Sequence, residues 1–319
     1  MKTRSYPGIT EVAAAVILKP DGAFLLGQRA ADTFYPGYWE FPGGKVEAGE
    51  TPRDALVREL HEELEIEVLE ASPWIMREHV YEHAHVRLHF FRVTAWRGEI
   101  KDHVHDALSW QRSDALDVSP MLPANAPVLA ALRLPDVYAI THAGEIGVTE
   151  QLRRLQRAVD GGLRLVQLRE PHLSPPDRAE FAREAVQICR AANARVLVNG
   201  DADLAHAAGA DGLHLPSALL MGMGRRPDFA LVAASCHTRA ELEHAAKLSL
   251  DFAVLGPVQA TASHPDQPGL GWAAFAQLAG NLPLPIYALG GMSGSDLKAA
   301  QKAGAHGIAA IRAAWNQAS

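Results

Sequence analysis

The chain has 319 residues, a length that suits two domains of ordinary size. Hydrophobic residues make up 48% and charged residues 21%, a balance that is typical of folded globular proteins and argues against a disordered chain. The formal net charge of −7 argues against a nucleic-acid polymer as partner, because such binding needs a basic surface.

The distribution of charge and the number of cysteines indicate where cations could bind and which cellular compartment suits the chain. Residues 1–130 hold 20 acidic and 13 basic residues, so the acidic surplus, which could hold cations or simply favour solubility, lies there. Two cysteines, Cys189 and Cys236, exclude a disulfide scaffold and suit a reducing compartment. No signal peptide is visible, and Val12–Leu18 is too short to span a bilayer. We therefore expect a cytoplasmic protein without a membrane partner.

The first part of the chain mixes strands and helices in an irregular order. We expect two strands paired around a turn at 20–22, then a glycine-bearing loop, a helix, and a long strand or hairpin. These segments are Val12–Leu18, Phe24–Gln28, Pro42–Gly49, Pro52–Leu64 and Val80–Val93. The order predicts an α+β or α/β sandwich.

Proline-rich sequence near residues 120–135 marks a boundary, which separates a domain at 1–132 from a second at 136–319. Eight strand-like runs follow it, at 137–142, 164–170, 195–200, 212–216, 231–237, 252–258, 285–291 and 307–313. Helical patterns separate most of them, which predicts an α/β fold of the (β/α)8 TIM barrel type. A doubly wound open sheet is the alternative.

The helix expected at Pro52–Leu64 has a clear start signal and a buried stripe. Thr51 is a good N-cap, and Pro52 suits the first helical position. Leu56, Leu60 and Leu64 recur every four residues and predict the face that packs on the core.

Glu59, Glu62 and Glu63 share another face of this helix, where like charges repel one another unless a cation lies between them. Oxygen ligands of this kind select Mg²⁺ or Mn²⁺, and Arg58 can orient Glu62. A solvated acidic face is the alternative interpretation of the same pattern.

The whole segment resembles the Nudix box, which is a glycine, five residues, Glu, seven residues, Arg-Glu-apolar-x-Glu-Glu, and then x-Gly-apolar. The matching positions are Gly44, Glu50, Arg58, Glu59, Leu60, Glu62, Glu63 and Ile66. Glu65 departs from the pattern, because the family has glycine there, and this puts the end of the helix in question. The resemblance implies an α/β/α sandwich with a mixed sheet. It also implies a catalytic set of Glu50, Arg58, Glu59, Glu62 and Glu63, with a metal held by the three helix glutamates and the carbonyl of Gly43.

The resemblance is closest to the MutT branch, which hydrolyses oxidised purine nucleoside triphosphates such as 8-oxo-dGTP. It implies a nucleotide site formed by Arg29, Phe34, Glu40, Phe41, Pro42, Gly43 and Asn125. Arg29 would touch phosphate or base. Asn125 would bond the purine edge, because an amide both donates and accepts; a turn residue between prolines is the alternative. Phe34 stands where MutT itself has histidine.

The implied reaction is attack of water on a phosphorus of the triphosphate, which releases pyrophosphate and the monophosphate. This activity would sanitise the nucleotide pool and so support DNA replication and repair. The general base stays open: Val104 stands where the branch has a loop glutamate, and His103, His105, Asp106 or a glutamate of the box could act. His83, His85 and His89 alternate, which indicates a polar strand face in preference to a metal site.

Polar residues also follow the strand-like runs of the second domain, where barrel enzymes place their active sites. This half resembles thiamine phosphate synthase and the related thiazole tautomerase over essentially all of 136–319. The matching site residues are Arg169, Asn199, Asp211, Ser235, His237, Thr261 and Gly291. The resemblance implies a thiazole or thiamine phosphate ligand and, for the synthase, Mg²⁺.

Departures from the synthase pattern leave the activity of the barrel open. Pro171 and His264 replace lysines, Gly200 replaces a metal-binding aspartate, and Arg312 replaces a serine, which weakens both the diphosphate clamp and the metal site. The barrel could be an active synthase, a tautomerase-like enzyme that uses His237 for proton transfer, or a non-catalytic module that regulates the hydrolase. A hydrolase of thiamine-pathway diphosphates is the alternative for the first domain. The sequence leaves the oligomeric state open.

Overall fold

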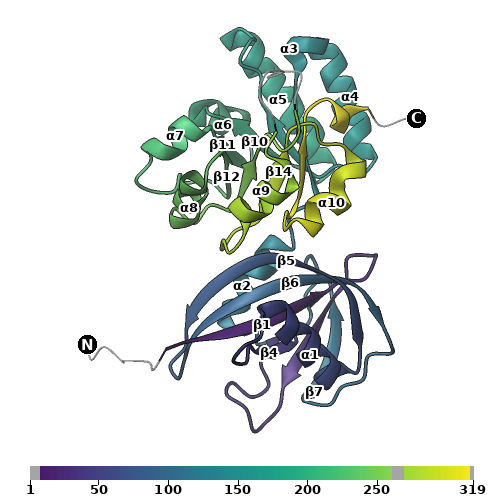
Figure 1. Cartoon of the computed structure of the whole chain (residues 1–319). Coiled ribbons are helices and arrows are strands. Elements are labelled where there is room, and N and C mark those ends of the chain that lie inside the picture. Colours follow the sequence, from purple (N-terminus) through teal and green to yellow (C-terminus); the bar gives the residue numbers. More distant parts are fainter. Residues whose placement is uncertain (1–7, 261–268, 317–319) are drawn as a thin grey trace. The chain divides into compact units, whose positions relative to one another are not determined.

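The computed structural model describes residues 8–260 and 269–316, which form two compact units (Figure 1). The first unit runs to Arg133 and includes Gly280–Pro283, and the second holds the other described residues. No helix in the described ranges is both long enough and apolar enough to cross a membrane.

The first unit contains two β-sheets. The larger sheet is mixed, with the order β4-β1-β6-β5, and β1 runs parallel to β6 and antiparallel to β4. The smaller sheet is antiparallel, with the order β3-β2-β7. The strands are β1 (Ile9–Ile17), β2 (Phe24–Arg29), β3 (Trp39–Glu40), β4 (Gly43–Lys45), β5 (Glu67–Val80), β6 (His85–Arg97) and β7 (His105–Gln111).

The expected pairing of the first two strands is wrong. β1 and β2 lie in different sheets, and a single bridge between Leu18 and Phe24 joins their ends. Both edges of β1 are already used, one by β4 and the other by nine residue pairs with β6. Long-range pairing therefore replaces the local hairpin. The later hairpin does form, but it begins earlier than predicted, because β5 starts at Glu67 and the turn lies at 81–84.

Alternation along β1 builds two cores. Ala13, Ala15 and Ile17 pack with the leucines of α1 (Pro52–Leu64), while Ala14 and Val16 pack in the cluster that contains Val128 and Leu129 of α2 (Ala126–Ala131). Leu56, Leu60 and Leu64 are fully buried, and each such side chain stabilises the fold by about 1.5–3 kcal/mol. The predicted α/β/α sandwich with a mixed sheet is confirmed.

The helix α1 begins and ends where the sequence predicts. The Thr51 hydroxyl accepts a hydrogen bond from the backbone N–H of Asp54 at 3.2 Å. At the other end, Glu65 adopts the left-handed conformation, with φ 53° and ψ 30°, which costs a non-glycine residue about 1–2 kcal/mol. Its carboxylate accepts bonds from Lys101 Nζ at 2.8 Å and His103 Nε2 at 2.7 Å. These contacts offset part of the strain and lower the pKa of Glu65.

The second unit is a closed barrel of eight parallel strands, which confirms the predicted TIM barrel (Figure 1). Its strands are β8 (Val137–Ile140), β9 (Leu165–Leu168), β10 (Arg195–Asn199), β11 (Gly212–Leu215), β12 (Leu231–Cys236), β13 (Phe252–Leu255), β14 (Ile286–Leu289) and β15 (Gly307–Ala310). Its helices are α3 (Ala143–Ile146), α4 (Val148–Asp160), α5 (Pro175–Ala191), α6 (Ala202–Ala208), α7 (Ser217–Gly222), α8 (Arg239–Lys247), α9 (Gly271–Ala279) and α10 (Leu297–Lys302).

Candidate functional site

Arg58 is the centre of an ion-pair network on α1. Its Nε and Nη2 donate to Glu50 Oε1 and Oε2 at 2.7 and 3.0 Å, and Nη2 also donates to the Lys45 carbonyl at 3.0 Å. Its Nη1 lies 3.0 Å from Glu59 Oε1 and 3.3 Å from Glu62 Oε2. The Arg58 guanidinium and the Glu47 backbone N–H lower the pKa of Glu50 to about 2. Arg58 therefore ties the loop before the helix to two of the predicted metal ligands.

Glu59 and Glu63 lie beside the glycine pair at β4. A Cβ atom at Gly44 would come within 2.2 Å of the Glu59 carboxyl group, so only glycine leaves room for it there. The Glu63 carboxylate accepts a hydrogen bond from the Gly43 backbone N–H at 3.1 Å. Burial, followed by the negative charge of Glu59, raises the pKa of Glu63 to about 8.

The donor set fits a hard divalent cation. Crowded, partly buried carboxylates repel one another, and oxygen ligands suit Mg²⁺ or Mn²⁺. Glu62 differs from Glu59 in exposure, because its side chain is 59% exposed and that of Glu59 is 16% exposed. Accordingly, the described residues contain no preassembled group of three His, Cys, Asp or Glu side chains. Of the three predicted metal ligands, Glu59 and Glu63 lie beside the glycine pair, while the Glu62 side chain is exposed.

Asp102 is a carboxylate in the neighbourhood of Glu63 that the sequence argument missed. It lies in the loop before β7, and its charge contributes to the raised pKa of Glu63. Its Oδ1 accepts the backbone N–H groups of Val104 at 3.2 Å and His105 at 3.0 Å, which fixes its position. The candidate base His103 is instead held by Glu65. The sequence did contain a signal for this residue, because Asp102 is an acidic residue only two positions before Val104, where the MutT branch has a loop glutamate.

A pocket of about 750 Å³ adjoins this acidic cluster, since Gly43 and Gly44 belong to both. Arg29, Phe34 and Glu40 line it as well, so the structure brings together four of the seven predicted nucleotide-binding residues. A volume of this size suits a small organic molecule.

Arg29 binds two neighbouring protein groups, the Glu40 carboxylate and the Phe34 carbonyl. Its Nη1 lies 2.6 Å from both carboxylate oxygens of Glu40, and its Nε donates to the Phe34 carbonyl at 2.7 Å. Burial outweighs the neighbouring guanidinium and raises the pKa of Glu40. Arg29 thus holds the loop that presents Phe34 to the pocket.

The structure does not bring the other three predicted nucleotide-binding residues to the pocket wall. Phe41 packs in the core against Phe24 and Phe90, with ring centroids 5.9 and 5.8 Å away. Pro42 is buried, and its carbonyl accepts the Ala15 N–H. Asn125 is 2% exposed, and its Nδ2 lies 3.9 Å from the Met121 sulfur.

The three alternating histidines do not share one strand face. His85 and His89 lie on β6, where they contact Glu78 at 3.3 Å and Glu11 at 2.7 Å. His83 instead lies in the turn before β6 and lines the pocket. His85 and His89 therefore lie on a polar strand face, as predicted, whereas His83 belongs to the candidate site.

A buried polar chain crosses the interior of the barrel. Gln167 Nε2 donates to the Tyr138 hydroxyl at 3.2 Å. The same hydroxyl lies 3.1 Å from His214 Nδ1. On the other side of the ring, His214 Nε2 lies 2.8 Å from Ser235 Oγ. Burial lowers the pKa of His214 to about 3, so the ring is neutral. With Nδ1 accepting from tyrosine, its proton resides on Nε2 and the bond runs to Ser235. The sequence argument did not identify Tyr138.

Several predicted residues lie at the carboxyl ends of the barrel strands. Arg169 follows β9 and is exposed, and Asn199 ends β10. His237 follows β12, and its Nδ1 lies 2.7 Å from the Gly256 carbonyl. Gly291 follows β14 with φ +70°, and a Cβ there would lie 3.0 Å from Gln259. Thr261 and His264 lie outside the described residues.

Asp211 is placed at the opposite end of the barrel from this group. It precedes β11, and its carboxylate accepts the Val196 backbone N–H at 2.7 Å. The residue therefore supports the amino end of β10, and its predicted ligand-binding role is not compatible with that position. Strand direction decides this, because the sequence run alone does not show where β11 begins.

Two charged residues near the carboxyl ends are occupied by structural contacts. Glu170 is 6% exposed, and its carboxylate accepts the backbone N–H groups of Ala143 at 2.7 Å and Gly144 at 2.9 Å. Arg312 makes a two-point ion pair with Glu145, at 3.0 and 2.7 Å. Neither side chain is therefore free to bind a ligand without a rearrangement.

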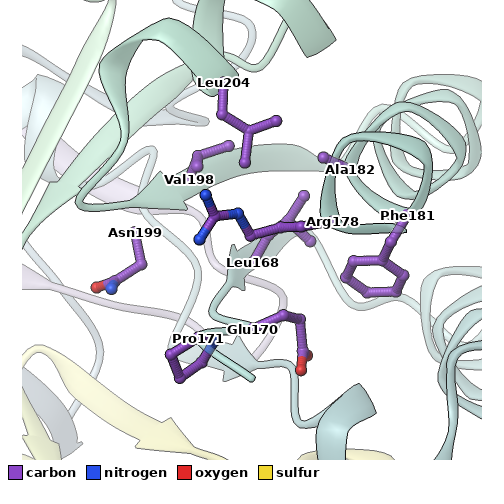
Figure 2. Close-up of a pocket in the computed structure, with 9 residues that line it drawn as sticks. All are labelled: Leu168, Glu170, Pro171, Arg178, Phe181, Ala182, Val198, Asn199 and Leu204. Atoms are coloured by element: carbon purple, nitrogen blue, oxygen red, sulfur yellow. The ribbon is translucent and has the colours of Figure 1, made fainter. Parts of the chain in front are cut away.

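A separate cavity of about 80 Å³ lies among β9, β10, α5 and α6 (Figure 2). Arg178 crosses it and donates to Asp201 at 3.2 Å, while Leu168, Phe181 and Val198 form apolar walls. The cavity is well below the size of ordinary ligand pockets. Asn199, one of the predicted ligand-binding residues, also lines it.

Comparisons with known proteins agree with both units. Residues 137–314 match the family model described as Thiamine monophosphate synthase, and residues 9–132 match the NUDIX domain. The thiamine-phosphate synthase of Azorhizobium caulinodans is 34% identical over 184 residues, which is 56% of this chain and 85% of that protein. The CTP pyrophosphohydrolase of Escherichia coli is 40% identical over 121 residues, which is 38% of this chain and 89% of that protein. The 8-oxo-dGTP diphosphatase of the same organism is 35% identical over 123 residues, which is 39% of this chain and 95% of that protein.

These matches cover nearly all of each described unit and identify two enzyme domains. Nudix hydrolases generally use divalent metal ions, and both families act on small molecules. The chain therefore belongs to the thiamine monophosphate synthase family through its barrel, and it carries a Nudix hydrolase domain ahead of that barrel.

Proposed function

We propose that the first domain hydrolyses a nucleoside triphosphate to the monophosphate and pyrophosphate. The observation that carries this proposal is the placement of Glu59 and Glu63 beside a 750 Å³ pocket through the shared residues Gly43 and Gly44. Phosphate chemistry and recognition of the rest of the nucleotide can then occur in adjoining spaces.

Mg²⁺ is the proposed metal, with Mn²⁺ as a substitute, and Glu59, Glu62 and Glu63 would hold it with the Gly43 carbonyl. When bound, it would neutralise charge on the phosphate oxygens and lower the pKa of a water molecule. Arg58 orients Glu59 and Glu62 through contacts of 3.0 and 3.3 Å. Asp102 is our candidate for the carboxylate that takes the proton of the attacking water.

The proposed substrate is 8-oxo-dGTP, in keeping with the 8-oxo-dGTP diphosphatase relative. That activity would serve nucleotide-pool sanitation, in support of DNA replication and repair. The buried position of Asn125 gives a reason to consider a second substrate, since its amide does not line the pocket in this conformation. The relative named CTP pyrophosphohydrolase makes CTP that second candidate.

Pyrophosphate release from the purified full chain with Mg²⁺ tests the hydrolase. The substrates are 8-oxo-dGTP, dGTP, CTP and thiamine diphosphate, with Glu63→Gln as the inactive variant and the exposed Glu67→Gln as matched control. Preference for 8-oxo-dGTP, lost only in Glu63→Gln, supports the proposal. Preference for thiamine diphosphate would instead mean that both domains serve thiamine metabolism.

For the barrel we propose binding of a thiazole or thiamine phosphate at the carboxyl ends of its strands. The position of His237 after β12, with its Nδ1 held by the Gly256 carbonyl, favours proton transfer of the tautomerase kind. The full synthase reaction is less favoured, because Pro171 and Gly200 remove a lysine and an aspartate. Calorimetry with thiamine phosphate, followed by a turnover assay, separates the possibilities. Binding with turnover supports an enzyme, binding alone supports a regulatory module, and no binding contradicts both.

A further inference from the structure

The side chain of His105 is almost entirely buried in the first domain, next to the carboxylate that we propose as the base. It is 5% exposed, and its Nδ1 lies 3.1 Å from Asp102 Oδ1. The His105 backbone N–H donates to the same oxygen at 3.0 Å. We propose that His105 is a positioning residue of the hydrolase, which holds the Asp102 carboxyl group where it can take a proton from the attacking water. This inference rests on the proposed hydrolase reaction and adds a residue to it.

Backbone hydrogen bonds hold the loop that carries Asp102 against the end of α1. The Lys101 N–H donates to the Leu64 carbonyl and the His103 N–H donates to the Glu63 carbonyl, each at 3.1 Å. Asp102 lies between these two anchored residues, and its charge is one of the causes that raise the pKa of Glu63. The loop backbone thus brings Asp102 near a proposed metal ligand. Backbone bonds do not fix side-chain torsions, so the carboxyl group needs contacts of its own.

Three N–H groups converge on one oxygen of Asp102. They are the backbone N–H of Val104 at 3.2 Å, the backbone N–H of His105 and the His105 ring nitrogen Nδ1. An ionised carboxylate only accepts hydrogen bonds, so Nδ1 carries the ring proton in this contact. The backbone bonds belong to a local turn around the aspartate and can form with many residue types at position 105. The ring bond instead requires a side chain with a donor at the place of Nδ1.

The pairing of β2 with β7 makes room for the His105 ring. The register shifts between Gln28 and Arg29, and Arg29 pairs with His105. A shift of this kind can re-aim a side chain. The ring lies over Gly27, where a Cβ atom would come within 2.2 Å of it. The irregular pairing and a residue without a side chain therefore both accommodate the histidine.

The proposed step needs the Asp102 carboxyl group in a fixed place. The water oxygen forms a bond to a phosphorus of the triphosphate, and the water proton goes to Asp102. The bond from that phosphorus to the leaving oxygen breaks, and its electron pair stays on the leaving group. Misplacing a reacting group by about 1 Å can cost roughly 100-fold in rate. His105 does not line the described pocket, so we expect its loss to lower kcat and to leave KM unchanged.

Steady-state hydrolysis by the full chain with Mg²⁺ tests the inference, with whichever of 8-oxo-dGTP, dGTP and CTP is hydrolysed fastest. His105→Phe fills the same space without a donor, and His105→Asn can donate from near the place of Nδ1. Asp102→Asn removes the proposed base. His85→Phe is the matched control, because His85 contacts Glu78 on a polar strand face. Thermal melts establish that each variant is folded.

We expect His105→Phe to lower kcat about 10- to 100-fold, with KM within about two-fold of wild type. His105→Asn should recover most of this loss, and His85→Phe should match wild type. In the Asp102→Asn background, His105→Phe should have no further effect, because His105 acts through that carboxylate. If His105→Phe does not fold, Gly27→Ala, which displaces the ring without removing it, takes its place with the same expectations.

A kcat equal to wild type in His105→Phe would overturn the inference, as would an equally large loss in the Asp102→Asn background. Hydrolysis that needs Glu63 but is indifferent to His105 would leave the proposed reaction standing without this inference. A wild-type chain that hydrolyses none of the three nucleotides would overturn the proposed reaction and the inference with it.

Discussion

The carboxyl group of Glu59 lies over Gly44, so close that a Cβ atom on that glycine would come within 2.2 Å of it. Glycine is therefore needed there for the position of a proposed metal ligand, because the space that a side chain would fill is already occupied by the carboxylate.

Replacing Gly44 with alanine should displace Glu59 without unfolding the domain, since the end of a glutamate side chain can move. We expect hydrolysis to fall about 10- to 100-fold, as for other changes that disorient a metal ligand. The melting temperature should shift little. Steady-state kinetics with a Mg²⁺ titration checks this, and Gly222→Ala, at a glycine with open space around it, is the control. Unchanged kinetics would mean that Glu59 is not a ligand.

The Arg58→Lys substitution should show the value of the two-point contact with Glu50. Lysine keeps the charge but cannot bond both Glu50 oxygens and reach Glu59 and Glu62 together. We expect kcat/KM to fall about 10- to 100-fold with weaker Mg²⁺ dependence. The double variant with Glu50→Gln should be no worse than the single variants combined, because both changes break one network. Activity equal to wild type in Arg58→Lys would show that charge alone suffices.

Two substitutions at Glu65 separate backbone strain from ion pairing. Glu65→Ala and Glu65→Gly both remove the contacts with Lys101 and His103, but only glycine relaxes the φ of 53°. We expect the glycine variant to exceed the alanine variant in unfolding free energy by about 1 kcal/mol. Urea denaturation followed by tryptophan fluorescence measures the difference. Equal stability would indicate that the end of α1 rearranges.

The barrel should lose stability in mild acid because of His214. Its pKa is lowered to about 3 in the folded chain, against an ordinary value of 6.5, so the unfolded state binds the extra proton between these values. The free energy of unfolding should therefore be constant above pH 6.5 and fall as the pH drops, by about 1.4 kcal/mol per pH unit from this group. Denaturant titrations from pH 7 to 5 should show a shallower slope for His214→Gln. Parallel slopes would contradict the neutral, buried state.

Asp211 and Asn199 should differ in what their loss affects. Asp211→Ala leaves the Val196 N–H without its acceptor and should lower the unfolding free energy by about 1–3 kcal/mol, with ligand affinity unchanged. Asn199→Ala, at the carboxyl end of β10, should weaken binding of thiamine phosphate with little effect on stability. Calorimetry and thermal melts of both variants check this contrast. A loss of affinity in Asp211→Ala would contradict the structural role and support the original prediction that Asp211 binds the ligand.

Local patterns determined the elements that depend on local physics. The N-cap at Thr51 and the leucine repeat predicted both bounds of α1, since capping and helical periodicity act within a few residues. The alternation of eight apolar runs with helical segments predicted the closed barrel, because parallel strands need crossover connections. The spacing of the glutamates placed Glu59 and Glu63 on one helix face for the same reason.

Tertiary structure decided what depends on contacts between distant segments. β1 pairs with β4 and β6 in place of β2, so both of its edges are used by segments farther along the chain. The same long-range folding brings Asp102 toward Glu63 and His83 onto Phe34, and it takes Asp211 to the far end of the barrel. The order of residue types along a chain shows helical and strand periodicity. The direction in which a side chain points, and its neighbours across a sheet, are decided only when distant segments pack together.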